Sequence, residues 1–330
     1  MEAYKQSQKG IIWGISASFF LSFTFLINSL IANSGGNWAW TANLRTLFLI
    51  PILGVVLFLT KQLLPLAGAL KQEFWLFAKW GTIGFGILYT FISIASLYSP
   101  GWMVAATFQI NIVAGILLAP LIYKDHRRKI PKRSVYLSLL ILVGVLVMQL
   151  ENFENLSSWQ NVSISFCLVL VGAIVWPLAN RKLMVKLEEK NLQLNATQRV
   201  LGMSVGCIPL LLMLALVGYN QSGFPPTSQL EASFYSALFS GFLGGVSFYF
   251  ATQMVHSQPV SLAAIEATQV LEIVFTLLGE IILLGTSVPG KFGIAGIAIV
   301  VAGLALHFVN ALKKSKQVES NTIAFFAKTN

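Results

Sequence analysis

The chain has 330 residues, of which 56% are hydrophobic and only 10% are charged. Soluble domains carry about 25% charged residues, so this chain has too little charge to cover a water-facing surface. Its net charge of +10 would favour nucleic-acid binding in a soluble protein. In so apolar a chain the basic residues instead report orientation in the membrane, and we expect no nucleic-acid partner.

Apolar stretches of membrane-spanning length follow one another along the whole chain. A spanning helix needs about 20 mostly apolar residues at a rise of about 1.5 Å each. Ten stretches qualify: 10–32, 40–60, 77–97, 101–123, 134–150, 162–180, 200–219, 234–254, 260–284 and 291–311. The alternating pattern typical of outer-membrane barrels is absent. The sequence therefore predicts an all-α membrane protein with ten transmembrane helices in the lipid bilayer.

Both ends of the chain are polar. Lys5 and Lys9 precede the first apolar run, which is too long for a signal peptide and lacks a small-residue cleavage signature. We therefore interpret 10–32 as a span of the mature protein. The stretch 313–330 is polar and contains lysines, and it is predicted to be a loose cytoplasmic tail.

The basic residues predict the orientation. With the N-terminus in the cytoplasm, 20 of the 22 lysines and arginines fall on the inner side, and only Arg45 and Lys291 fall outside. The reverse topology would violate the positive-inside rule almost everywhere. The sequence thus predicts a multi-pass protein of the plasma (inner) membrane with cytoplasmic N- and C-termini. The basic cluster at 124–133 is interpreted as an orientation signal.

The two halves of the chain resemble each other. Three residues have an identical partner 159 residues later: Gly86 with Gly245, Pro100 with Pro259, and Gly144 with Gly303. The repeat unit holds five spans, and an odd number of crossings places the second copy upside down. We therefore predict two inverted five-helix repeats at 1–155 and 156–312, followed by the tail. Secondary transporters use inverted repeats for alternating access, with the substrate site between the halves.

Several motifs carry a family resemblance. The five-plus-five pattern, Arg45 at the start of the second span, the Tyr98–Gly101 junction and the Gly279-Glu280 pair together resemble the drug/metabolite transporter (DMT) superfamily. A narrower likeness, to the bacterial multidrug resistance efflux transporter family (EmrE-like, ten-span), rests on three stretches: Gly35–Trp38, Ser99–Trp102 and Arg127–Pro131. The resemblance extends to about residue 312, and it implies a transporter of small molecules.

One departure from the family pattern changes the expected mechanism. The resemblance to the four-span EmrE-like proteins implies an essential membrane glutamate in the first helix. Neither the first span nor its counterpart, the sixth, contains an acidic residue. A coupling carboxylate, if the chain has one, must therefore lie in another span.

The ninth span (260–284) concentrates the membrane carboxylates. Glu272 lies close to the predicted bilayer centre, and Thr268, Gln269 and Thr276 share its helix face by spacings of three and four. Charged residues inside spans are costly and usually mark function, so we predict a substrate- and proton-binding site there. Glu266 is a second candidate, nearer the cytoplasmic side. The alternative is that these polar groups only bond neighbouring helices.

Four further residues are predicted to be structural or gating. Glu280 lies near the outer end of the ninth span, where a structural role is favoured. Arg45 lies near the outer end of the second span, where it could neutralise a carboxylate such as Glu280 or reach the interface. Pro100 and Pro259 begin the fourth and ninth spans at equivalent repeat positions.

Uncharged residues are candidates for the rest of a cavity. Gln109 and Asn111 in the fourth span could line the wall opposite the ninth span, or could simply bond neighbouring helices. Trp176, Tyr89 and Tyr249 lie within spans, where their rings could attract lipophilic cations or else face lipid.

The leading hypothesis is a secondary active exporter of small lipophilic or cationic molecules, by H⁺ antiport with alternating access. No lysine or arginine falls near the predicted midplane, which favours cationic or neutral substrates over anions. The alternatives are an exporter of amino acids or other metabolites and, in another class, an intramembrane enzyme or sensor. Clustered catalytic pairs and metal-ligand spacings are absent, so we expect neither enzymatic activity nor a cofactor or metal. A monomer and a homodimer both remain open.

Overall fold

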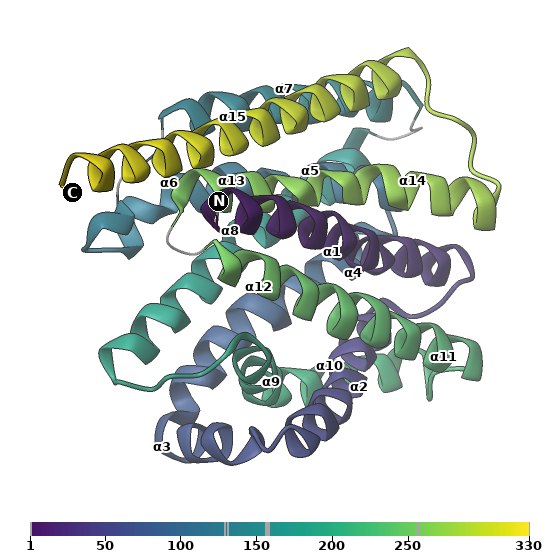
Figure 1. Ribbon diagram of the computed structural model, residues 1–330. Helices are drawn as coiled ribbons and strands as arrows, with labels where there is room; N and C mark the ends of the chain where they lie inside the picture. Colours follow the sequence, from purple (N-terminus) through teal and green to yellow (C-terminus); the bar gives the residue numbers. More distant parts are fainter. Residues whose placement is uncertain (1, 129, 131, 156–158, 256–257, 330) are drawn as a thin grey trace.

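The computed structural model describes residues 2–128, 130, 132–155, 159–255 and 258–329. Within these ranges the chain is helical, with short loops and no strand (Figure 1). The predicted boundary between the halves falls beside 156–158, and Lys129 and Pro131 of the predicted basic loop also lie outside the described residues. The all-α prediction is confirmed.

The helices follow one another in this order: α1 (Glu2–Asn33), α2 (Trp38–Leu59), α3 (Leu63–Gly81), η1 (Thr82–Ile87), α4 (Leu88–Ala95), α5 (Gly101–Phe108), α6 (Ile110–Ile122), η2 (His126–Arg128), α7 (Lys132–Asn155), α8 (Trp159–Glu189), α9 (Ala196–Gly206), α10 (Ile208–Ser222), α11 (Thr227–Ser236), η3 (Ala237–Gly244), α12 (Gly245–Met254), α13 (Pro259–Ala267), η4 (Thr268–Val270), α14 (Leu271–Leu284) and α15 (Lys291–Thr329). The elements η1 and η3 are π-helical, whereas η2 and η4 are 3₁₀ turns.

These elements form candidate membrane spans at the predicted positions. Among the described residues, nine helical stretches are long and apolar enough to cross a bilayer. A tenth is formed if α9 and α10, which meet at an angle of 51°, count as one bent span. The bend lies at Cys207, directly before Ile208 and Pro209, and proline interrupts helical hydrogen bonding.

Several helices continue beyond the predicted ends of their spans, and three do so most. The third extends back to Leu63, the sixth continues to Glu189, and α15 runs to Thr329 through the region predicted to be a loose tail. The region predicted to be a tail is thus helical over its described residues, and its division from the last span stays a prediction. The length of an apolar stretch indicates only the part of a helix that lies in the hydrocarbon core, and the helix itself can extend further. It ends where the backbone leaves the helical conformation: after α8 the chain turns at Asn191, whose φ is +56°.

Elements of the two halves interlock. Helix α1 packs against η3 and α12, α8 packs against η1 and α4, and α2 packs against α9 and α10. Helices α7 and α15 lie side by side (Figure 1). Close packing there depends on Gly144 and Gly296, because a Cβ on Gly144 would lie 2.8 Å from the Gly296 carbonyl oxygen. The inverted relation of the two halves stays a prediction.

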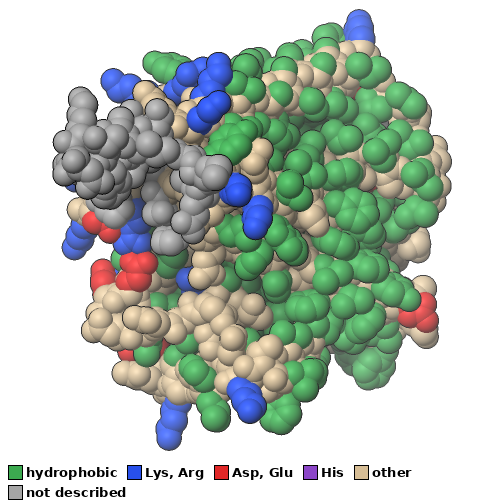
Figure 2. Space-filling view, viewed as in Figure 1, with side chains coloured by type: hydrophobic (Ala, Val, Ile, Leu, Met, Phe, Trp, Pro, Cys, Tyr) green, Lys and Arg blue, Asp and Glu red, His purple; other side chains and the backbone are tan. Residues whose placement is uncertain are grey.

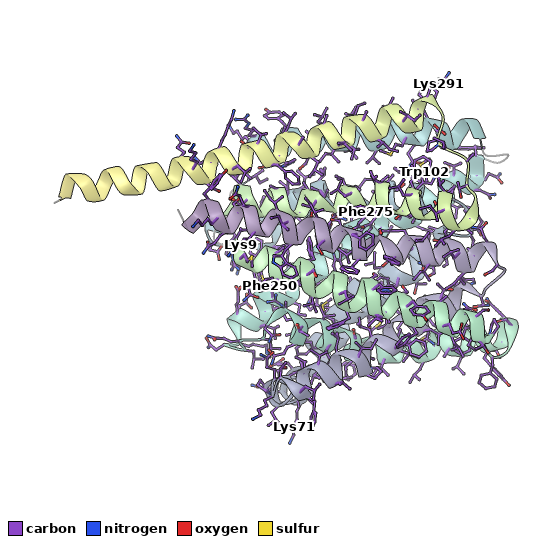
Figure 3. All side chains as sticks on the ribbon, turned by 45° about the vertical axis from the view of Figure 1, so that its right-hand side comes forward. Lys9, Lys71, Trp102, Phe250, Phe275 and Lys291 are labelled. Carbon is purple, nitrogen blue, oxygen red and sulfur yellow. The ribbon has the colours of Figure 1, made fainter. Side chains whose placement is uncertain are left out.

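The distribution of hydrophobic and charged side chains on the surface is typical of a membrane protein. Figure 2 shows hydrophobic side chains over most of the visible face, with basic side chains gathered mainly toward the end that carries both termini. In Figure 3, Lys9 lies toward one end of the bundle, and Trp102 and Lys291 lie at the other. Helices satisfy their own backbone hydrogen bonds, so this apolar face can contact lipid.

Candidate functional site

A central cavity lies where α1, α2, α4, α8, α9, α12 and α14 converge. Its cavity volume is about 60 Å³. Its wall is mostly apolar and aromatic, with a few polar groups: Leu21, Thr24, Phe25, Arg45, Leu49, Phe85, Leu88, Tyr89, Ile92, Phe108, Trp176, Val200, Ser240, Gly241, Gly245, Phe248, Tyr249, Gln269 and Glu272. An apolar wall with few polar groups is typical of small-molecule sites.

Irregular helical segments shape this cavity. The π-helical segments η1 and η3 supply Phe85, Ser240 and Gly241 to the wall, and the 3₁₀ turn η4 supplies Gln269. A π-helical turn contains an extra residue, so it rotates the following side chains relative to a regular helix, and such turns are frequent at functional sites. Gly241 allows close approach there, because a Cβ at this position would lie 2.9 Å from Leu49 Cδ1.

Glu272 supplies the cavity's carboxylate. It lies in the first turn of α14, and its side chain is only 2% exposed. Its Oε1 atom has no hydrogen-bond partner among the described residues. The neighbouring polar group is the side chain of Gln109, which lies at the junction of α5 and α6. The predicted midplane carboxylate therefore faces a cavity, and no ion pair involves it among the residues that the structure describes.

Arg45 supplies the cavity's basic side chain, although it was predicted to be a structural or gating residue near the outer end of its span. It lies about two turns into α2 and is 4% exposed. Its Nη2 donates a hydrogen bond to Ser240 Oγ over 2.9 Å, and its guanidinium carbon lies 3.9 Å from the centre of the Tyr89 ring. Hydropathy alone missed this placement because Arg45 lies near the end of its apolar stretch.

Several other predicted residues meet in this cavity. Gln269, Tyr89, Trp176 and Tyr249 all line it. Trp176 stacks on Phe85, with ring centres 5.6 Å apart and planes inclined by 21°. Residues distant in sequence thus form one aromatic wall, although their role in binding stays a prediction.

The structure places four predicted residues outside the cavity wall. Thr268 and Thr276 face α1: the Thr268 carbonyl accepts a hydrogen bond from Ser18 Oγ over 2.7 Å, and Thr276 Oγ1 donates to the Ser22 carbonyl over 3.4 Å. The other two, Gln109 and Asn111, are buried between helices beside the cavity. The stripe on the ninth span is therefore divided between the cavity and a helix contact.

Glu266 also lies outside the cavity wall, at a junction of three helices. Its Oε1 lies 3.1 Å from Nη2 of Arg181 on α8, and Arg181 Nη1 donates to the carbonyl of Gly115 on α6. Sequence reasoning assigned Arg181 to an inner loop and missed this pair. The pair forms because α8 continues beyond its apolar stretch, which keeps Arg181 on the helix.

Glu280 holds the beginning of another helix. Its carboxylate accepts hydrogen bonds from the backbone N–H of Gly101 over 2.8 Å and of Trp102 over 3.1 Å, and from Ser29 Oγ. Pro100 is the N-cap residue of this helix, α5. Pro259 similarly begins α13. The suggested pairing of Arg45 with Glu280 is wrong, because Arg45 lines the cavity instead.

A second, more open pocket adjoins the cavity at the loop between α8 and α9. Its wall includes Glu188, Asn195, Arg199 and Gln253. Arg199 directly precedes Val200, which lines the central cavity, and its guanidinium carbon lies 6.0 Å from the Tyr249 ring centre. Arg199 and Tyr249 therefore lie between the two spaces.

Comparison with known proteins places this arrangement in a family. Residues 8–313 match the EmrE family, described as "Putative multidrug resistance efflux transporter". The chain belongs to the EmrE family. Family membership makes it a multi-pass membrane transporter with a small-molecule substrate, and it confirms the resemblance seen in the sequence motifs.

Relatives in bacteria share most of the EmrE-family chain. It is 39% identical over 327 residues to the "Uncharacterized protein YjlA" of Bacillus subtilis (strain 168), a match covering 96% of this chain and 100% of the relative. It is 36% identical over 267 residues to the "Uncharacterized 42.1 kDa protein in intracellular alkaline protease 3'region" of Shouchella clausii, which covers 79% of this chain and 69% of the relative. A crystal structure matches with a TM-score of 0.61 at 14% identity, over 93% of this chain and 98% of that one, and shows likeness of fold alone.

Proposed function

We propose that this EmrE-family protein is a secondary active exporter that binds small lipophilic molecules with a cationic group in the central cavity. The observation that carries the proposal is Glu272, a buried carboxylate on the wall of an apolar and aromatic cavity, with one oxygen unpartnered among the described residues. A membrane carboxylate without a basic partner is expected to hold either a proton or a cationic group.

Competition at Glu272 would couple the two movements. A proton and a cationic substrate group neutralise the same carboxylate, so both cannot occupy it at once. Binding of protons from the outside would then release substrate outward, and substrate binding from the cytoplasm would release protons inward. The Trp176 ring favours cationic groups by cation–π attraction.

Alternating access would expose this cavity to each side in turn. The proposal takes the two halves as inverted repeats, and the interlocked packing of α1 with α12 and of α8 with α4 supports it. The pocket beside Arg199 would be the cytoplasmic approach, since the loop at 190–195 belongs to the side predicted to be inside. Cytoplasmic N- and C-termini are part of the same proposal.

Proton release on substrate binding and transport is the direct test. The purified protein would be reconstituted in liposomes containing a pH-sensitive dye, and lipophilic amines such as phenethylamine would be screened for proton flux. Glu272→Gln should abolish substrate-dependent flux, whereas Glu231→Gln on exposed α11 should retain it. Unchanged proton flux in Glu272→Gln would overturn the assignment.

The other transport candidate, an exporter of amino acids or other metabolites, is favoured by one observation. Arg45 lines the same cavity as Glu272, and a fixed cation suits substrates that also carry an anionic group.

A further inference from the structure

Arg45 and two hydroxyl side chains form a polar corner in the otherwise apolar cavity. Nη2 of Arg45 donates to Ser240 Oγ, and Ser240 Oγ is hydrogen-bonded to Thr24 Oγ1. All three residues line the cavity. The remaining side-chain nitrogens of Arg45, Nε and Nη1, are buried and have no hydrogen-bond partner among the described residues. The corner therefore has donors without a geometric hydrogen-bond partner, beside the Tyr89 side chain, which also interacts electrostatically with the guanidinium.

The charge of Arg45 likewise has no counter-charge among the described residues. Within the described residues, its neighbours are the Ser240 hydroxyl and the Tyr89 ring, and no carboxylate lies within ion-pair distance. A guanidinium cannot shed its proton in a protein, so burial does not neutralise it. An unpaired buried charge is costly, and a purely structural arginine would be expected to have a counter-charge. An anion bound to Nε and Nη1 would supply that counter-charge.

Glu272 gives the same cavity an opposite charge at a separate place. It comes from α14, whereas Arg45 comes from α2, and the two side chains form no ion pair. A molecule that carries both an ammonium and a carboxylate group could satisfy both residues at once. The aromatic residues of the same wall, which include Trp176 and Phe108, would take its apolar part.

We propose that Arg45, Ser240 and Thr24 form a carboxylate subsite, and that the transported substrate is a zwitterion with an apolar body. This deepens the proposed function, on which it rests, because it assumes that the cavity is the substrate site. A carboxylate fits better than a phosphate, since one guanidinium faces the corner and a phosphate dianion would retain an unbalanced charge. The planar guanidinium matches a carboxylate with two parallel hydrogen bonds.

Four probes that share one phenyl skeleton test the subsite. Phenylalanine carries both charges, phenylalaninamide and phenethylamine carry only the cation, and 3-phenylpropionate carries only the anion. Binding to the purified full-length protein would be measured by titration calorimetry, and transport in the same liposomes. A charge-assisted hydrogen-bonded contact predicts that phenylalanine binds about ten- to a hundredfold more tightly than phenylalaninamide.

Substitutions of Arg45 test whether the preference for phenylalanine arises from the proposed carboxylate subsite. Arg45→Gln should reduce the preference for phenylalanine over phenylalaninamide to about onefold, because the charge-assisted contact with the carboxylate is lost. Arg45→Lys should retain part of the preference. The cation-only probes report that the Arg45→Gln cavity is still folded.

Two results would overturn the subsite. One is equal binding of phenylalanine and phenylalaninamide by the unaltered protein, and the other is an undiminished preference in Arg45→Gln. Failure of the proposed function looks different, since none of the four probes would then drive proton flux in the unaltered protein. If the amine and the amide drive flux and phenylalanine has no advantage, only the carboxylate subsite fails.

Discussion

Arg181 on α8 and Glu266 on α13 form an ion pair in which Nη2 and Oε1 lie 3.1 Å apart. Their side chains are 17% and 23% exposed, so the pair is largely shielded from water. Because Arg181 also donates to the Gly115 carbonyl, the pair ties three spans together.

Removal of one partner of this pair should destabilise the protein. Arg181→Gln leaves Glu266 partly buried without its counter-charge, which we expect to cost about 1–3 kcal/mol after allowance for solvent screening. Thermal unfolding in detergent, followed by tryptophan fluorescence, measures the change. The double variant Arg181→Gln/Glu266→Gln should recover part of the loss. If the double variant lost as much stability as the two single variants together, the ion pair would contribute nothing specific to stability.

Loss of the Glu280 carboxylate should loosen the start of α5. Glu280→Ala leaves the N–H groups of Gly101 and Trp102 without their acceptor, at an expected cost of about 1–3 kcal/mol. Ser29→Ala, which removes only one donor to the same carboxylate, should cost less. Equal melting temperatures for Glu280→Ala and the unaltered protein would contradict this role.

A methyl group at Gly144 should separate α7 from α15. Its Cβ would lie 2.8 Å from the Gly296 carbonyl oxygen, and backbone cannot move aside as a flexible side chain can. We expect Gly144→Ala to cost about 1–3 kcal/mol in thermal unfolding. Gly54→Ala is the matched control, since its Cβ would meet no atom within 4 Å. Similar melting temperatures for the two variants would contradict the packing argument.

Trp176 should contribute to binding through its ring. Trp176→Ala removes an aromatic wall that stacks on Phe85, and we expect about tenfold weaker binding of phenethylamine. Trp176→Phe should lose less because it retains a ring. Trp75→Ala is the control, because Trp75 is 82% exposed and does not line the cavity. Unaltered phenethylamine affinity in Trp176→Ala would place the ligand elsewhere.

The proposed orientation has its own prediction. In a background with Cys167 and Cys207 replaced by serine, Arg128→Cys should react with an impermeant maleimide only after the cells are permeabilised. Asn220→Cys, at the exposed end of α10, should react in intact cells. Both expectations follow from the positive-inside rule. The opposite labelling pattern would reverse the topology.

The sequence alone determined the class of the protein and the positions of its spans. Membrane helices are specified by local hydropathy, because lipid leaves every helix to satisfy its own backbone. The loop charges predicted an orientation, and the motifs from Gly35 to Pro131 indicated the family that residues 8–313 match. Glu272 was also predictable as a candidate, since a carboxylate in the middle of a membrane span is rare.

Only the tertiary structure decided which polar residues share a space. Arg45 was expected near the outer surface, yet α2 places it in the cavity with Glu272, whereas Thr268 and Thr276 turn toward α1. Glu266 meets Arg181 only because α8 continues past its apolar stretch. Hydropathy measures the free energy of transferring a segment into the lipid bilayer. It contains no information on which faces of separate helices pack together. That choice depends on side-chain packing between segments distant in the chain, and it gives this cavity both a cation and an anion.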